Sequence, residues 1–276
     1  MTRARKTAAK AQIDFAHTLA DISASAILPH FRTRLAVENK ARKGTAAGTG
    51  FDPVTVADRA AERAIRKAIA GRYPDHGIVG EEYAAVAGSS RYRWVIDPID
   101  GTRAFITGSP LWGTLIGLMD GPTPVLGLMN QPFTGERVWS DGAEARWRRP
   151  DGGVRRIETR ACARLADAIL TTTHPDLFAP GAEAADFAAV KSRARMTRYG
   201  GDCYAYCLLA AGCIDVIIEA GLKPFDVVAL VPIIEAAGGI VTTWEGASAC
   251  DGGRILAAGD RRTHQEAMAL LGSHRP

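Results

Sequence analysis

The sequence has no apolar run long enough to span a bilayer, and its first residues lack the apolar core of a secretory signal. We therefore expect no membrane-spanning segment and no membrane partner. Five cysteines form an odd set without a Cys-x-x-Cys pair, and six histidines are scattered along the chain, which argues against a zinc site. Buried thiols that act as small apolar side chains are the favoured interpretation, and a reducing, cytoplasmic location is the expectation.

Internal repeats and low-complexity segments are also lacking. The 276 residues are 47% hydrophobic and 23% charged, which is ordinary for a globular protein with a substantial core. The net charge of +4 lies partly in a basic N-terminal tail and in the Arg-rich segment 146–149. Solvated faces are the more common role of such segments, so we expect no nucleic-acid partner. Without a flexible linker, residues 1–276 are predicted to form a single domain with an N-terminal α+β half (1–150) and a C-terminal α/β half (151–276).

Hydrophobic periodicity predicts the elements. In the first half, helices are expected at 7–31 and 55–71, strands at 78–79, 94–97, 111–119 and 123–131, and a basic turn at 146–153. Pro98 is expected to end its strand in a rigid corner, because it cannot donate to a sheet ladder. In the second half, the expected helices are 182–194, 203–211, 224–237 and 261–271, and the expected strands are 168–172, 214–219, 240–243 and 255–258.

Acidic side chains gather at the predicted strand ends. Asp97 and Asp100 follow a hydrophobic strand, Glu81 and Glu82 end the strand before it, and Asp226 opens a later helix. The two aspartates alone could be turn residues, since Asp favours turns. Acids that end separate strands can, however, converge on one face, where repulsion between like charges calls for a cation. Carboxylate oxygens suit Mg²⁺, so we predict a magnesium site.

A second signal follows directly in the chain. Gly101 and Thr102 lead into a segment that could begin a short helix, whose first N–H groups could bind an anion. Acids for a cation beside amides for a phosphate indicate metal-assisted phosphoryl chemistry.

Three blocks carry a resemblance to a known family. They are Gly80-Glu81-Glu82, the stretch from Trp94 to Thr102 with Phe105 and Gly108-Ser109-Pro110, and Phe225-Asp226 with Glu235-Ala236-Ala237-Gly238-Gly239. Together they resemble the signatures of the inositol monophosphatase family of Mg²⁺-dependent phosphatases, from about residue 10 to 270. The resemblance implies an α/β (α+β) class with the layered αβαβα sugar-phosphatase fold, a phosphate-monoester substrate and a homodimer.

The resemblance also implies roles for individual residues. The metal ligands carry over onto Glu81, Asp97, the Ile99 carbonyl, Asp100 and Asp226. Asp58 and Glu82 are placed near a further metal, and Thr102 is paired with Asp58 to orient the attacking water. By sequence alone, Asp58 is an exposed acid in a first helical turn, and Thr102 an ordinary cap.

The implied mechanism is in-line displacement by water, with the phosphate held by the Gly101 and Thr102 amides and no Ser or Cys nucleophile. The spacing Asp-x-x-Asp differs from the Asp-x-Asp of phosphatases that form an aspartyl-phosphate. An EF-hand is excluded because the loop lacks the alternating oxygen ligands.

Within the family, the chain looks like the histidinol-phosphate phosphatase branch. It has Arg103-Ala104 where the inositol branch usually shows Thr-Asn, and the blocks that support the branch are 112–118, 131–137, 198–206 and 219–226. Histidinol phosphate carries an ammonium and an imidazole, so its pocket needs acidic acceptors. Glu219 and Asp202 are the candidates, although Asp202 could instead cap the helix that follows it. Arg103 could reach the substrate phosphate or form a surface salt bridge.

Two other functions stay open. One is a broader inositol or sugar monophosphatase, and the other is a non-catalytic regulator that binds phosphate or metal.

Lys40 resembles part of the family's mobile loop, but the Gly-rich stretch 41–51 departs from the pattern, which leaves the loop's closure and a third metal open.

Overall fold

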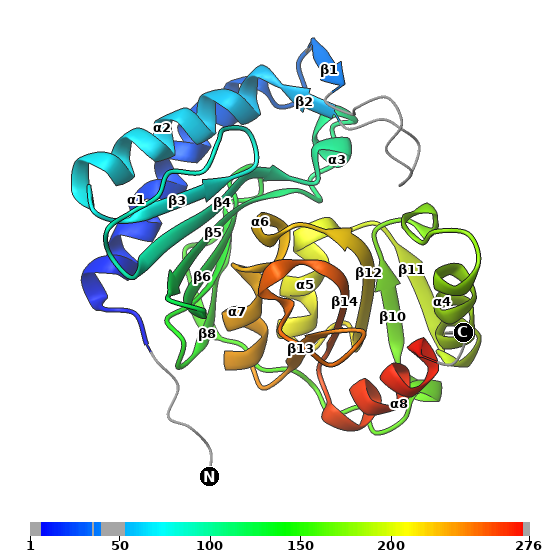
Figure 1. Ribbon diagram of the computed structural model, residues 1–276. Helices are drawn as coiled ribbons and strands as arrows, with labels where there is room; N and C mark the ends of the chain where they lie inside the picture. Colours follow the sequence, from blue (N-terminus) through cyan, green and yellow to red (C-terminus); the bar gives the residue numbers. More distant parts are fainter. Residues whose placement is uncertain (1–6, 35, 40–52, 273–276) are drawn as a thin grey trace.

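Five layers stack in the order helix, sheet, helix, sheet, helix (Figure 1). The structure is a computed structural model that describes residues 7–34, 36–39 and 53–272. Lys40 and the Gly-rich stretch 41–51 lie outside the described residues. The layered α/β fold predicted from the family resemblance is confirmed.

Two long helices form the first layer, α1 (Lys10–Ile27) and α2 (Val56–Arg72). Their apolar positions recur at helical spacing and are buried, as at Leu19 and Ile27 in α1 and Ile65 and Ile69 in α2. A short 3-10 turn, η1 (Leu28–His30), follows α1, and the small antiparallel pair β1 (Val37–Asn39) and β2 (Pro53–Thr55) precedes α2. Both helices lie on the same face of the first sheet (Figure 1).

The first sheet has seven strands in the order β3-β4-β5-β6-β7-β8-β9. Only its β3–β4 pair is parallel, and the others are antiparallel. The strands are β3 (Gly77–Gly80), β4 (Tyr92–Asp100), β5 (Gly113–Asp120), β6 (Thr123–Gln131), β7 (Glu136–Ser140), β8 (Ala145–Arg148) and β9 (Val154–Arg156). The prediction of a basic turn over 146–153 is wrong at its start, because residues 146–148 belong to β8. Alternate β8 side chains are buried, among them Trp147, so the arginines occupy the other face of a paired strand.

Pro98 does not end its strand, contrary to the prediction. Strand β4 continues to Asp100, and its pairing with β5 shifts between Asp97, opposite Leu115, and Asp100, opposite Gly113. Pro98 and Ile99 therefore face the single residue Thr114, which is the arrangement of a β-bulge. A bulge tolerates proline because the missing N–H is not required there. The expected corner is thus a bulge inside a continuous strand.

The second sheet has five strands in the order β11-β10-β12-β14-β13. They are β10 (Ile169–Thr172), β11 (Met196–Tyr199), β12 (Val216–Leu222), β13 (Ile240–Thr243) and β14 (Gly253–Ala258), with short 3-10 turns at η2 (Leu165–Asp167), η3 (Pro175–Leu177) and η4 (Ala249–Asp251). Helices α4 (Ala182–Arg193) and α8 (Arg261–Leu271) cover its outer face. The edge strand β11 was not predicted; three of its four side chains are exposed, so it lacks a clear apolar alternation.

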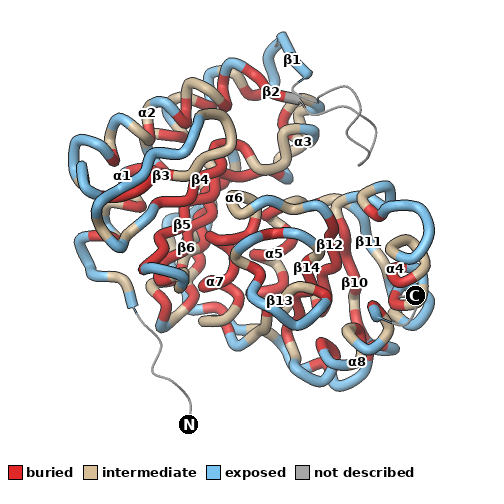
Figure 2. The backbone as a smooth tube through the Cα atoms, in the orientation of Figure 1, coloured by how far each residue is buried: buried red, intermediate tan, exposed pale blue. Residues whose placement is uncertain are grey.

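The middle layer lies between the two sheets and consists of α5 (Asp202–Ala210), α6 (Pro224–Val227) and α7 (Leu230–Ala236). The prediction of one helix over 224–237 is corrected to two helices. One apolar cluster joins Leu115 and Met129 of the first sheet to Leu209 of α5 and to Ile217 of the second sheet. Figure 2 shows the buried residues concentrated along these inner strands and helices. The middle layer therefore fixes one sheet against the other.

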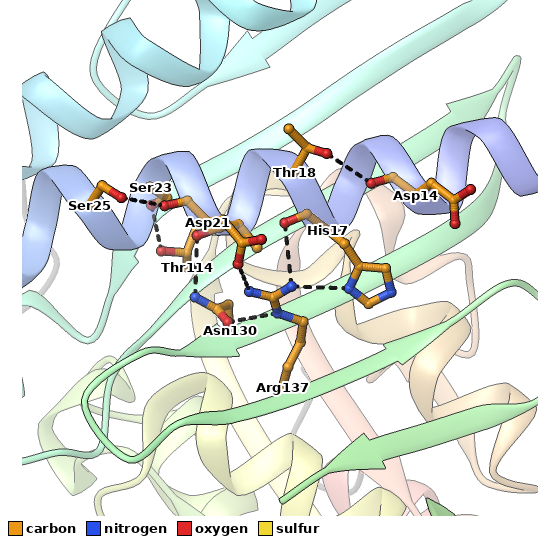
Figure 3. Close-up of polar contacts among 10 residues, drawn as sticks. Asp14, His17, Thr18, Asp21, Ser23, Ser25, Thr114, Asn130 and Arg137 are labelled. Carbon is orange, nitrogen blue, oxygen red and sulfur yellow. Dashed lines mark hydrogen bonds and ion pairs between the residues drawn. The ribbon is translucent and has the colours of Figure 1, made fainter. Parts of the chain in front are cut away.

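Polar contacts hold α1 to the first sheet (Figure 3). Arg137 of β7 is almost fully buried and donates to the Asn130 side chain at 2.8 Å, to the His17 carbonyl at 3.3 Å and to Asp21 at 2.5 Å. Two residues beyond Asp21 in α1, the Ser23 hydroxyl lies 2.8 Å from the Thr114 hydroxyl of β5. Such buried groups fix the position of the helix along the sheet, because any slip would leave them without partners.

No helix in the described part of the chain is long and apolar enough to cross a membrane.

His264 on α8 provides a test of the packing of the outer layer. Burial lowers its pKa from 6.5 to about 4, helped by the nearby Arg261. The folded chain therefore binds this proton less well than the unfolded chain, and stability falls as the pH drops from 6.5 toward 4. We expect His264→Asn to reduce the loss of unfolding free energy between pH 7 and pH 5, measured by urea denaturation. The exposed His174, changed to Asn, serves as the control; an equal reduction there would contradict the assignment.

Candidate active site

Three carboxylates meet where the first sheet faces the middle layer. Asp97 and Asp100 come from the bulged end of β4, and Asp226 lies in α6. One oxygen of each lies within 4.8 Å of the others, so the group could hold a metal ion. Oxygen ligands at such spacing suit a hard divalent cation. The predicted convergence of acids from distant parts of the chain is found at these three positions.

Other predicted site residues lie close enough to Asp97 and Asp100 to change the pKa values of these two carboxyl groups. Burial raises the pKa of Asp97 well above its usual value, and the charges of Glu81, Asp100, Asp226 and Asp58 raise it further. Asp100 behaves in the same way, through burial and then the charges of Asp202 and Asp226. A cluster of this kind stores repulsion that a bound cation would relieve.

Asp58 is fully buried, so its description as an exposed acid in a first helical turn is wrong. Its Oδ2 atom accepts hydrogen bonds from the backbone N–H of Thr55 at 2.9 Å and from the Thr55 hydroxyl at 2.6 Å. This is a capping arrangement at the start of α2. The sequence placed Asp58 in the first turn of a helix but did not reveal its burial, because the end of β4 and helix α3 (Thr102–Ile106) pack against this helix terminus.

The bulge of β4 shapes the next part of the site. Ile99 is fully buried, and its N–H donates to Asp97 Oδ1 at 3.0 Å. The Thr102 hydroxyl, in α3 (Thr102–Ile106), donates to the Ile99 carbonyl at 3.2 Å. Thr102 is thus in contact with a carbonyl that the family resemblance assigns to a metal.

Glu81 and Glu82 lie just beyond β3, which ends at Gly80. Their turn is held by Glu62 of α2, which sequence reasoning missed: its fully buried carboxylate accepts the Glu82 N–H at 2.7 Å and the Tyr83 N–H at 3.2 Å. A Cβ on Gly80 would come within 2.2 Å of Glu62 Oε1, so any larger residue there would displace the Glu62 carboxylate from these two N–H groups. Glu62 has one local signal, an i,i+4 pair with Arg66.

Because Gly101 has no side chain, Asp202 can lie close to the end of β4. Its φ of 88° lies in the left-handed region, and an added Cβ would lie 3.0 Å from the Leu111 carbonyl and 3.1 Å from Asp202 Cγ. The adjacent Cys203 N–H, in the first turn of α5, donates to Asp100 Oδ2 at 2.6 Å. Sequence reasoning missed this role of Cys203, since it is a backbone contact across more than a hundred residues.

Asp202 and Glu219 form the acidic side of the site next to Asp226. Burial raises the pKa of Asp202 to about 6, with Arg103 opposing the rise and Asp226 adding to it. Burial raises the pKa of Glu219 to about 8, and the charges of Asp202 and Asp226 act in the same direction against hydrogen bonds from Thr173. Glu219 Oε1 accepts from the Thr173 N–H and hydroxyl, whereas its buried Oε2 has no hydrogen-bond partner among the residues that the structure describes.

A family model for the inositol monophosphatase family matches residues 9–275. The chain belongs to this family. The match spans both sheets and every acidic residue described above, so the chain is a phosphatase of the inositol monophosphatase family.

Individual relatives of known function include phosphatases of more than one kind. The chain is 41% identical to the chloroplastic bifunctional phosphatase IMPL2 of Arabidopsis thaliana, over 94% of this chain and 74% of that protein. It is 33% identical to a histidinol-phosphatase of Streptomyces coelicolor, over 93% of this chain and 95% of that protein. Among solved structures, an inositol monophosphatase from Zymomonas mobilis superposes with a TM-score of 0.81 and 39% identity, covering 96% of this chain and 99% of that chain.

Gly101 offers a test of the site's geometry. Replacing it with alanine forces an unfavourable φ and a contact with the Leu111 carbonyl and Asp202, so we expect phosphate release to fall by roughly tenfold or more, as misplaced site residues do. Gly121→Ala is the matched control, since its φ of 60° is also left-handed but an added Cβ meets nothing within 4 Å. That control should lose about 1 kcal/mol of stability and keep its activity. Equal activity of the two variants would contradict this description of the site.

Proposed function

We propose that this phosphatase hydrolyses L-histidinol phosphate to L-histidinol and phosphate, as a Mg²⁺-dependent phosphomonoesterase of histidine biosynthesis. The observation that carries the proposal is the acidic pair Asp202 and Glu219 beside the carboxylate cluster, with one buried Glu219 oxygen lacking a partner among the described residues. A substrate with an ammonium and an imidazole supplies the donors and positive charge that such a pair requires. Histidinol-phosphatases among the relatives support the same substrate.

The donor set supports Mg²⁺ as the metal. Asp97, Asp100 and Asp226 would hold it, with Glu81 and the Ile99 carbonyl as further oxygen ligands, and Glu82 and Asp58 near a further ion. A bound Mg²⁺ would supply Lewis-acid chemistry, lowering the pKa of water and neutralising charge on the phosphoryl oxygens.

The chain's own groups would perform the remaining tasks. Thr102 and Asp58 would orient the water, whose oxygen forms a bond to phosphorus while the ester P–O bond opposite breaks. The Gly101 and Thr102 amides would hold the phosphate, and Arg103, which acts electrostatically on Asp202, would bind at the phosphate side. The alcohol leaves on the side of Asp202 and Glu219; the attacking water gives up one proton and the leaving oxygen takes up one, so the products are L-histidinol and phosphate.

The metal requirement is tested with Asp100→Asn. This change removes one ligand charge without changing the volume, so we expect Mg²⁺-dependent phosphate release to fall by roughly a hundredfold or more, with an unchanged circular dichroism spectrum. The exposed Asp151, changed to Asn, is the control and should keep wild-type turnover. A wild-type rate for Asp100→Asn would refute the assignment.

The substrate is tested with a panel of phosphate esters and free phosphate as the readout. We expect kcat/KM for histidinol phosphate to exceed that for inositol 1-phosphate by roughly a hundredfold or more. Glu219→Gln should raise KM for histidinol phosphate by about tenfold, because an amide cannot ionise beside the substrate ammonium as a carboxyl group can, while p-nitrophenyl phosphate hydrolysis changes little. Glu158→Gln, at an exposed position, is the matched control.

Two results of the panel would replace the proposal. A preference for inositol 1-phosphate would favour the broader monophosphatase, which the similarity to the Zymomonas mobilis protein also supports. Absence of Mg²⁺-dependent release from every ester would favour a non-catalytic regulator.

A further inference from the structure

The Pro98 carbonyl lies inside the bulge, between the two residues Asp97 and Ile99. Because Pro98 and Ile99 together face one residue of β5, the regular ladder is interrupted here. The Thr114 hydroxyl donates to the Pro98 carbonyl at 2.8 Å. A side chain therefore supplies a hydrogen bond at the point where the backbone ladder is broken.

The number of hydroxyl protons decides which group donates in the contact between Ser23 and Thr114. A hydroxyl has one proton, and a carbonyl can only accept, so the Thr114 proton is directed to Pro98. Ser23 Oγ lies 2.8 Å from Thr114 Oγ1 and must be the donor in that pair (Figure 3). Ser23 and Thr114 are both fully buried, so no water competes for either hydroxyl.

The planar peptide transmits this contact to Asp97. The Pro98 carbonyl and the Ile99 N–H belong to one rigid peptide unit, so fixing the carbonyl also aims the N–H. That N–H donates to Asp97 Oδ1 at 3.0 Å. The direction of the Asp97 carboxylate thus depends on Thr114, and through Thr114 on helix α1.

We propose that Ser23 and Thr114 are positioning residues that hold the Pro98–Ile99 peptide, and through it Asp97, in the geometry required for the metal ion to bind. This inference depends on the metal centre of the proposed function but not on which ester is hydrolysed. Neither hydroxyl contacts a carboxylate of the cluster directly, so the effect passes through the Pro98–Ile99 peptide.

The experiment measures binding of Mn²⁺ alone, without substrate, by loss of the free-ion electron paramagnetic resonance signal. Thr114→Val keeps the shape of the side chain but removes the donor, and it should weaken Mn²⁺ binding by roughly ten- to hundredfold, as for other groups that orient metal ligands. Thr114→Ser restores the hydroxyl and should bind within about twofold of wild type. Ser23→Ala should give a smaller loss, and the double variant Ser23→Ala/Thr114→Val should bind no more weakly than Thr114→Val alone.

Ile116→Val is the matched control, because Ile116 is a fully buried residue two positions along the same strand and takes no part in this chain of hydrogen bonds. It should lower the unfolding temperature and leave Mn²⁺ affinity unchanged. Wild-type affinity in Thr114→Val, failure of Thr114→Ser to restore binding, or an equal loss in Ile116→Val would overturn the proposal.

The same measurements separate this inference from the proposed substrate. A wild-type chain that binds Mn²⁺ but does not release phosphate from histidinol phosphate would refute only the substrate. A wild-type chain that binds no Mn²⁺ would refute the metal centre and, with it, the positioning role.

Discussion

Repulsion among closely spaced carboxylates is the constraint on which this structure depends. Asp97, Asp100 and Asp226 are held close enough to share one ion, although burial and mutual charge oppose ionisation of the first two. Such an arrangement is stable only when the surrounding fold determines the position of each group. The two sheets, locked by the middle helical layer, provide that rigidity, since α6 carries Asp226 and the first sheet carries the other two acids.

Backbone N–H groups hold the three carboxylates of the cluster in place. The Cys203 amide binds Asp100, the Ile99 amide binds Asp97, and the Lys223 amide binds Asp226 at 2.6 Å. Each donor is a backbone N–H, which can stabilise a carboxylate without adding a competing charged side chain. These N–H groups therefore favour the charged form of the acids against the effect of burial, and the fold supplies the orientation.

The acidic character extends beyond the cluster to Asp202 and Glu219. A continuous group of this kind would bind a metal at one end and a positively charged organic group at the other. Arg103 lies near enough to Asp202 to oppose the rise in its pKa, so a positive side chain acts on the acidic side of the site. Under the proposed function, this distribution of charge, rather than the fold alone, would favour one phosphate ester over another.

The sequence by itself determined the fold class, most element positions and the acidic residues. Regular periodicity identified α2 and α8, and the block from Trp94 to Thr102 identified strand β4 and its two aspartates. It did not reveal the bulge at Pro98, the burial of Asp58, the break between α6 and α7, or the contacts of Glu62, Cys203 and Thr114. Periodicity and short motifs report local preference, whereas these features arise where segments distant in the chain pack together. Only the tertiary structure decides which buried polar groups meet, because each must find a partner that the local sequence does not supply.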